Sequence, residues 1–198
     1  MNKTYIIAGI AVLAVAVYFI LFFQQAYTFD SGLEKINSFW EKQDLKPVDL
    51  TFPLKVYAAE ESKLVSLKSD LESFQSSLEN QQNSEDKEKL ELLAETQLAL
   101  VSNALLQKQN FASIDFFESN DYDFDVLCSS MDKAEDLQTN LVLQNQTAES
   151  CNAKILAFSE SYPVEAEKAG IASLQLETGS SENLSELEDL IKSLQVVC

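Results

Sequence analysis

Residues 64–78 read LVSLKSDLESFQSSL, and the spacing of their side chains establishes the fold class. The apolar residues recur at steps of three and four, which is the spacing of one face of an amphipathic helix. The charged side chains of this stretch fall away from that seam. We therefore expect a helix over residues 57–81, whose seam consists of Tyr57, Leu64, Leu67, Leu71, Phe74 and Leu78.

Two longer segments that follow repeat the pattern. After a polar break, Ser84 is placed to cap a second helix over residues 84–110, which carries a broad apolar stripe. Steps of three and four between Ala134 and Phe158 predict one continuous helix over residues 126–160, about 50 Å long. Short turns between such helices favour an antiparallel bundle within one chain. The alternative is that seams of separate chains pair as an oligomeric coiled coil.

Shorter helices are expected after the third long one. Pro163 opens a weaker helix that reaches about residue 176, and a final helix runs from residue 184 nearly to Cys198. The whole chain has only 4 glycines and 3 prolines, too few turn residues for an all-β fold. The prediction is an all-α protein: an N-terminal transmembrane helix, then an antiparallel bundle of three long helices and shorter C-terminal helices.

The membrane anchor is predicted from residues 5–23, which run from Tyr5 to Phe23 without a charged side chain. As a helix they are about 28 Å long, close to the thickness of about 30 Å of the bilayer's hydrocarbon core. We expect a retained anchor whose partner is the lipid bilayer. A cleaved signal peptide and a pilin-type leader are the alternatives, although the apolar run is longer than a signal peptide needs.

The lysine distribution predicts the orientation of this anchor. Lys3 precedes the apolar run, whereas Asp30 and Glu34 follow it, so the N-terminus is expected in the cytoplasm and residues 24–198 outside. This single-pass arrangement gives three parts: residues 1–29 as cytoplasmic tip and anchor, 30–56 as juxtamembrane helix and proline-containing connector, and 57–198 as the helical bundle domain.

Residues 30–56 link the anchor to the bundle. Ser31 and Glu34 fit a capping box and predict a helix over residues 31–44, in which Phe39 and Trp40 pack on the domain or touch lipid headgroups. Pro47 and the proline six residues later predict an extended connector over residues 46–54, packed on the bundle through alternate apolar side chains.

Residues 111–125 interleave aromatic and acidic side chains and are expected to interrupt the helical pattern. We expect the aromatic rings to plug one end of the bundle while the carboxylates face water. An exposed docking loop is one alternative. The other is a calcium loop, which lacks the glycine such a loop needs because Val126 stands at that position. Its ligands would be Asp121, Asp123, Asp125 and Asp132.

The chain has 3 cysteines, and no two of them form a Cys-x-x-Cys motif. Cys128 and Cys151 are separated by about 34 Å if the helix between them is unbroken, too far for a disulfide. If the last helix runs back along the third, Cys198 reaches Cys128. We therefore predict a Cys128–Cys198 disulfide and a buried Cys151, with three reduced thiols as the alternative.

Composition restricts the function classes. The formal net charge is −18, and all of the 14 cationic side chains are lysines, because the chain contains no arginine and no histidine. Such a chain repels nucleic acid, and it lacks the side chain that most acid–base and metal sites use. Asn145 and Asn183 lie in glycosylation sequons, which chance also explains in a chain rich in Asn, Ser and Thr.

The expected function is that of a membrane-anchored, non-enzymatic helical bundle, an interaction or structural component of the cell envelope with a protein partner. No catalytic, cofactor-binding or metal-binding residue is assigned. The alternative is an extracytoplasmic ligand-sensing or solute-binding domain, with a cavity between the helices near residues 111–125.

Overall fold

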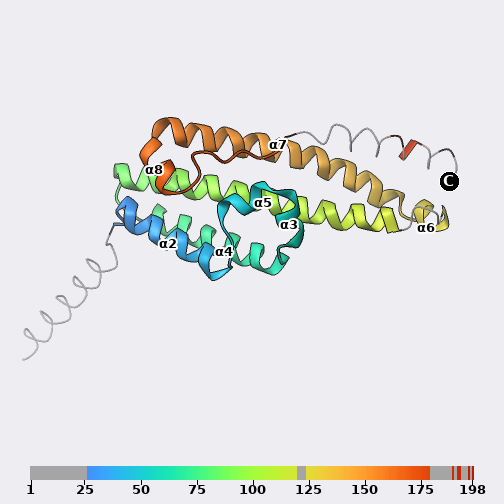
Figure 1. Cartoon of the computed structure of the whole chain (residues 1–198), viewed down its shortest axis with the longest axis horizontal. Helices are drawn as coiled ribbons and strands as arrows, with labels where there is room; N and C mark the ends of the chain where they lie inside the picture. Colours follow the sequence, from blue (N-terminus) through green and yellow to red (C-terminus); the bar gives the residue numbers. More distant parts are fainter. Residues whose placement is uncertain (1–25, 120–123, 179–188, 190, 193–195, 197) are drawn as a thin grey trace, which may run out of the picture.

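The computed structural model describes residues 26–119, 124–178, 189, 191–192, 196 and 198 (Figure 1). Within these ranges the chain forms helices and no β-strand, which confirms the all-α fold class. The elements are α2 (Phe29–Lys42), the 3₁₀ helix η1 (Pro47–Thr51), α3 (Pro53–Ala58), α4 (Glu61–Glu79), α5 (Glu85–Ser119), α6 (Phe124–Cys128), α7 (Met131–Ser161) and α8 (Pro163–Lys168).

Helix α5 is the centre of the bundle. It has 35 residues and is therefore about 52 Å long. Helix α4 precedes it in an antiparallel hairpin, and α7 returns along it in the opposite direction (Figure 1). Ser84 Oγ accepts a hydrogen bond from the Lys87 backbone N–H at 3.1 Å, so the predicted N-cap is confirmed. The expected antiparallel bundle is present.

Helix α5 has more neighbouring helices than α4, which explains why the apolar stripe of α5 is broad and the apolar seam of α4 is narrow. Helix α5 packs against α2, α3, α4, α7 and η1, so it buries side chains in several directions. On α4 only one face is covered. Its buried residues are the predicted seam from the second turn onward, Leu64, Leu67, Leu71, Phe74 and Leu78.

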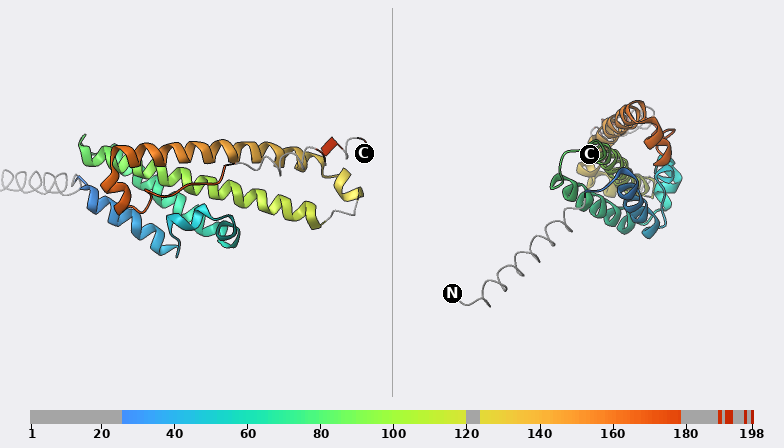
Figure 2. Two further views of the ribbon diagram at one scale, coloured as in Figure 1. Left: turned by 45° about the horizontal axis from the view of Figure 1, so that its top comes forward. Right: turned by 90° about the vertical axis from the view of Figure 1, so that its left-hand side faces the viewer.

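The bundle has two ends of different width. The start of α2, the α4–α5 turn and α8 lie at the wide end, whereas α5 and α7 continue past α4 toward α6 (Figure 2). A separate apolar cluster fills this narrow arm. Its buried members are Phe117, Leu127, Ala134, Leu137, Leu141 and Ile191.

The first described helix begins earlier than predicted. Thr28 is the N-cap of α2, because its Oγ1 accepts from the Ser31 backbone N–H at 3.3 Å, so Ser31 is not the cap. The expected packing of the aromatic pair is confirmed. Trp40 is buried, and the Phe39 ring lies at 6.3 Å from the ring of Phe74.

The extended connector over residues 46–54 was a wrong prediction, because two short helices replace it. Pro47 and Pro53 each stand at the start of a helix, where a proline's missing N–H is tolerated. Asp49 Oδ2 accepts from the Lys46 backbone N–H at 3.0 Å and stabilises the first turn of η1. Leu50 is buried, but Phe52 is 54% exposed, so alternate side chains do not pack together on the bundle.

Two helix boundaries near α4 and α5 also differ from the prediction. The helix expected over residues 57–81 divides at Ala59 and Glu60, so Tyr57 belongs to α3 and is 47% exposed. Helix α5 continues to Ser119, so residues 111–119 do not interrupt the helical pattern. Phe111 packs edge-on to the Tyr57 ring at 5.4 Å, and Phe117 is buried in the arm.

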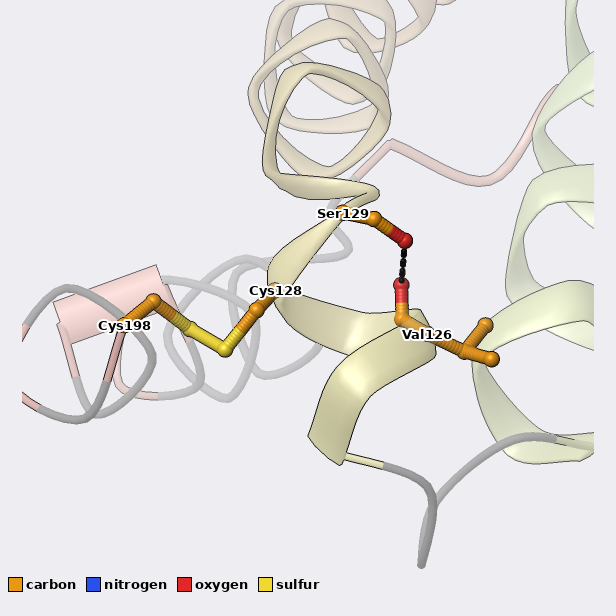
Figure 3. The surroundings of a disulfide bond; sticks show 4 residues. All are labelled: Val126, Cys128, Ser129 and Cys198. Carbon is orange, nitrogen blue, oxygen red and sulfur yellow. Dashed lines mark hydrogen bonds between the residues drawn. A yellow bond between two sulfur atoms is a disulfide. The ribbon is translucent and has the colours of Figure 1, made fainter.

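The continuous helix expected over residues 126–160 is broken near its start. Helix α6 ends at Cys128, and α7 begins at Met131. At the break the Ser129 side chain donates a hydrogen bond to the Val126 carbonyl at 2.9 Å, which satisfies a carbonyl that the ending helix leaves free (Figure 3).

The helix after Pro163 ends much earlier than residue 176. Gly170 has φ +67°, and the Ile171 N–H donates to the Ala166 carbonyl at 3.1 Å, which is a Schellman ending of α8. Residues 171–178 then follow the bundle without helical structure and bury Ile171, Leu174 and Leu176. Most of the final helix expected from residue 184 lies outside the described residues, although 189, 191, 192 and 196 are helical.

The predicted anchor from Tyr5 to Phe23 lies outside the described residues. Among the helices that are described, none combines the length and the apolar character required to cross a bilayer.

Candidate functional site

A pocket of about 250 Å³ lies against the middle of α5. Helix α7 forms the opposite wall, and η1, the start of α3 and the end of segment 171–178 complete the lining. Apolar side chains supply one part of the lining: Leu50, Phe111, Ile114, Leu141 and Leu176.

Carboxamide side chains supply the polar part of the same pocket. They come from two helices, Asn103, Gln107 and Asn110 from α5 and Gln144 and Asn145 from α7. On α5 the spacing of four and three places all of its amides on one helical face. The two walls are joined directly, because Asn110 Nδ2 donates to Gln144 Oε1 at 2.6 Å.

Two of these amides are buried with an acceptor left over. Asn103 is 3% exposed and Asn110 is 2% exposed, and no donor among the described residues reaches the Oδ1 atom of either side chain. A buried amide oxygen without a hydrogen bond costs about 1–3 kcal/mol. Both oxygen atoms are themselves fully buried, so a molecule in the pocket reaches them only if a neighbouring side chain moves.

The pocket carries almost no charge. Glu177, on the exposed side, is the one ionisable residue among the described residues that line it. No lysine is among them. Recognition of a phosphate or carboxylate has no charge-assisted donor here, since such sites use Arg, Lys or helix N-termini.

One wall is fixed by a side chain that does not line the pocket. Asn152 on α7 pairs with the backbone of Leu176, accepting from its N–H at 2.8 Å and donating to its carbonyl at 2.9 Å. This pairing imitates one rung of a β-ladder. It holds the non-helical segment 171–178 against α7.

The sequence located the cavity only roughly. Of the stretch 111–125, Phe111 and Ile114 line the pocket, and the other lining residues lie elsewhere in the chain. The polar face of α5 was missed. The sequence did contain this pattern, because Asn103, Gln107 and Asn110 recur at helical spacing and Gln144 stands in the otherwise apolar seam of α7.

The predicted disulfide is confirmed. Cys128 at the end of α6 is bonded to Cys198, with 5.5 Å between their Cα atoms (Figure 3). Cys151 is buried, also as predicted, and burial raises the pKa of its thiol to about 11. A thiol of this kind is a poor nucleophile at neutral pH.

The remaining candidate positions bring no further site together. Asp125 and Asp132 are exposed, and the described residues hold no cluster of metal-ligating side chains, while Asp121 and Asp123 lie outside the described residues. The sequon residue Asn145 is half-buried in the pocket wall. Asn183 lies outside the described residues.

Ion pairs tie α8 to the wide end of the bundle. Lys89 on α5 is 2.7 Å from Glu165 and 2.8 Å from Glu85, and Lys168 is 2.8 Å from Asp30 on α2. The hydrogen bond from Lys89 holds the pKa of Glu165 below its usual range, and the two carboxylates raise the pKa of Lys89. The Lys89–Glu165 and Lys168–Asp30 pairs link different helices, whereas Glu85 and Lys89 both stand on α5, and none of these residues lines the pocket described above.

No protein-family model, curated protein sequence or solved structure matches this chain.

Proposed function

We propose that this chain is a single-pass membrane protein that acts without catalysis, as an interaction or structural component of the cell envelope. The apolar run from Tyr5 to Phe23 supports the tether, with the N-terminus in the cytoplasm and the bundle outside. The lack of histidine and arginine throughout the chain supports a non-enzymatic role and disfavours nucleic acid as a partner.

The observation that carries this proposal is the difference between the two ends of the bundle. The described chain begins beside the start of α2 at the wide end, and the disulfide and α6 lie at the far end of the narrow arm (Figure 2). Helix α5 alone is about 52 Å long. A bundle tethered at its wide end would hold the disulfide-closed tip away from the bilayer, where a protein partner can reach it.

Extraction and cross-linking test this proposal in native membranes. The full-length protein is expected to resist alkaline carbonate extraction, and protease added to intact cells should digest residues 30–198. A photo-cross-linking residue at exposed Ser129 at the tip should capture a protein partner. The same residue at exposed Gln82, in the α4–α5 turn of the wide end, is the matched control. Release by carbonate, or protection of the bundle from protease, overturns the proposal.

The amide pocket favours ligand binding as a second candidate function. Its buried Asn103 and Asn110 oxygens lack hydrogen-bond partners among the described residues. Stability should rise on saturable binding of a small molecule, since a ligand that binds only the folded state stabilises it. A screen of neutral metabolites by melting temperature, repeated on Asn110→Leu, tests this function; an absence of any Asn110-dependent shift counts against it.

A further inference from the structure

An exposed apolar patch lies where η1 meets α3. Among the eleven large apolar side chains that are exposed within the described residues, four stand within ten consecutive positions. They are Val48, Phe52, Leu54 and Tyr57, which we call the η1–α3 patch. Leu54 is 83% exposed and Phe52 is 54% exposed. Large apolar side chains gathered at one place on a surface mark an interaction site.

The packing of the two short helices keeps this patch in contact with water. Leu50 in η1 and Val56 in α3 are both buried, and a proline opens each of the two helices and fixes its φ angle there. Phe52 and Leu54 stand between these two buried side chains. They therefore cannot turn inward unless Leu50 or Val56 leaves the core.

Two lysines beside the patch have no acidic partner. Lys46 and Lys55 are exposed, and neither forms an ion pair within the described part of the chain. The other lysines in that part all contact a carboxylate, another oxygen atom or an aromatic ring. Residues 46–58 hold two lysines against one aspartate, a formal charge of +1 in a chain of formal net charge −18. Apolar side chains between two available cations fit an anionic surface with an apolar interior, which is the chemistry of a lipid bilayer.

The bilayer is also the partner within reach. Helix α2 begins six residues after the apolar run ends at Phe23, is 14 residues or about 21 Å long, and leads directly to η1. In Figure 2, α2 and α3 lie on the side of the bundle away from α7. A tether this short raises the effective concentration of lipid at the patch to about the millimolar range, so a contact that is weak by itself suffices.

We propose that the η1–α3 patch docks on the anionic surface of the bilayer that holds the tether. Phe52 and Leu54 enter the interface, and Lys46 and Lys55 bind lipid headgroups. This inference rests on the tether of the proposed function. The acidic charge on the rest of the chain is screened beyond about 8 Å at physiological salt, so the local charge decides the contact. Docking turns the α2 side of the bundle toward the lipid and leaves α7 facing away.

The test uses the full-length protein in nanodiscs of phosphatidylcholine, made with and without phosphatidylglycerol. An environment-sensitive dye is attached to Leu54→Cys, and nitroxide-labelled lipids serve as quenchers. Labelling is specific because Cys151 is buried and the other two cysteines are bonded to each other. The dye should be quenched in discs that contain phosphatidylglycerol. The same dye on Leu156→Cys, which is 59% exposed on α7, is the matched control and should not be quenched.

Variants connect the docking to the patch. One lysine near an anionic membrane surface changes the docking equilibrium about fivefold, so Lys46→Gln/Lys55→Gln should weaken docking about tenfold or more. Lys154→Gln removes a cation from α7 and should leave the quenching unchanged. Phe52→Ser, in the dye-labelled protein, should also reduce quenching. Circular dichroism checks that each variant is folded, and the changed side chains of the patch are exposed.

The outcomes separate this inference from the tether. Protein that elutes without lipid overturns the tether and the docking together. Protein that stays in the discs without quenching at Leu54→Cys overturns the docking alone. A dye that reports an apolar environment but is not quenched places the patch against protein, either residues 5–23 or a second copy, and overturns lipid docking. Quenching that is equal without phosphatidylglycerol, or unchanged in Lys46→Gln/Lys55→Gln, overturns the assignment of an anionic surface.

Discussion

The side chain of Asn152 and the backbone of Leu176 satisfy each other completely: the N–H of Leu176 donates to Oδ1 at 2.8 Å, and its carbonyl accepts from Nδ2 at 2.9 Å. Leu176 follows α8 by a non-helical path, so its peptide groups have no helical partners. Asn152 stands about two turns from the middle of α7 and replaces those partners. One half-buried asparagine on a helix thereby positions a wall of the pocket.

Asn152→Leu should release this wall. Both backbone groups of Leu176 lose their partners, and the variant should be about 1–3 kcal/mol less stable to urea. Proteolysis should become faster at residues 171–178, because the segment is no longer held against α7. Asn152→Asp is the comparison variant: it keeps the acceptor for the Leu176 N–H, but it replaces the donor with a carboxylate oxygen that faces the Leu176 carbonyl. Equal protease resistance of all three proteins would contradict the role of this pairing.

The Cys128–Cys198 disulfide should contribute much of the stability of the narrow arm. It closes a loop with a sequence separation of 70, for which the entropy model gives about 4 kcal/mol. Reduction with a phosphine should lower the melting temperature by roughly 10 °C. The double variant Cys128→Ser/Cys198→Ser should melt at the reduced temperature with or without phosphine. A melting temperature of the native protein that phosphine does not change would contradict this prediction.

The periodic parts of the fold could be predicted from sequence because helix periodicity is a local property. The α4 seam and the Ser84 cap depend on residues a few positions apart, and both are correct. The break at Ser129 was missed because the seam of α7 starts at Ala134 and carries no information about earlier residues. The extension of α5 was missed because acidic residues interrupt the aromatic spacing after Phe111.

The pocket could not be predicted because it depends on contacts between distant segments. Leu50, Asn110, Gln144 and Leu176 belong to four segments that meet only after α5 and α7 have paired and segment 171–178 has folded back. A sequence pattern shows that Gln144 stands in an apolar seam, but not what it faces. By contrast, the disulfide was predicted because antiparallel helices of known rise bring specific positions side by side.

The Cys151 thiol should not react with thiol reagents until the protein unfolds. It is fully buried beside the Thr96 carbonyl, and burial raises the pKa of its thiol to about 11. The native protein should therefore show no reactive thiol at pH 8, one in denaturant, and three in denaturant after reduction. Rapid labelling of the native protein would contradict the burial of this side chain.

The same thiol should make stability fall at alkaline pH. The unfolded thiol ionises near pH 9 and the folded one near pH 11, so the folded state loses stability as the pH rises between these values. Cys151→Ala should remove this slope while keeping the alkaline effects of the lysines. The measurement is urea unfolding at pH 8, 9.5 and 10.5 for both proteins, and parallel curves would contradict the prediction.

The Lys89–Glu165 pair should make stability depend on acidic pH. Because the hydrogen bond from Lys89 lowers the pKa of Glu165, the unfolded state takes up a proton first as the pH falls. The contribution is complete above the ordinary glutamate pKa of about 4.5 and is lost as the pH falls through the folded value. Glu165→Gln should melt earlier than the parent at pH 7, and the difference between their melting temperatures should shrink as the pH falls below 4.5. The exposed neighbour Glu167→Gln should match the parent throughout this pH range.

Trp40 and Gln97 should behave as an energetically coupled pair between α2 and α5. The indole N–H of Trp40 donates to Gln97 Oε1, and both side chains are buried. Gln97→Leu leaves the indole N–H without an acceptor, which costs about 1–3 kcal/mol, but it also removes Gln97 Nε2, a buried donor without a partner among the described residues, so the net loss should be smaller. Trp40→Phe removes the donor together with part of the ring volume.

The Trp40→Phe/Gln97→Leu double variant should be more stable than the sum of the single effects predicts, because neither the donor nor the acceptor of this pair is then left unpaired. Urea unfolding followed by circular dichroism measures all four proteins, since fluorescence is lost with Trp40, and strict additivity would show that the hydrogen bond does not couple the two helices.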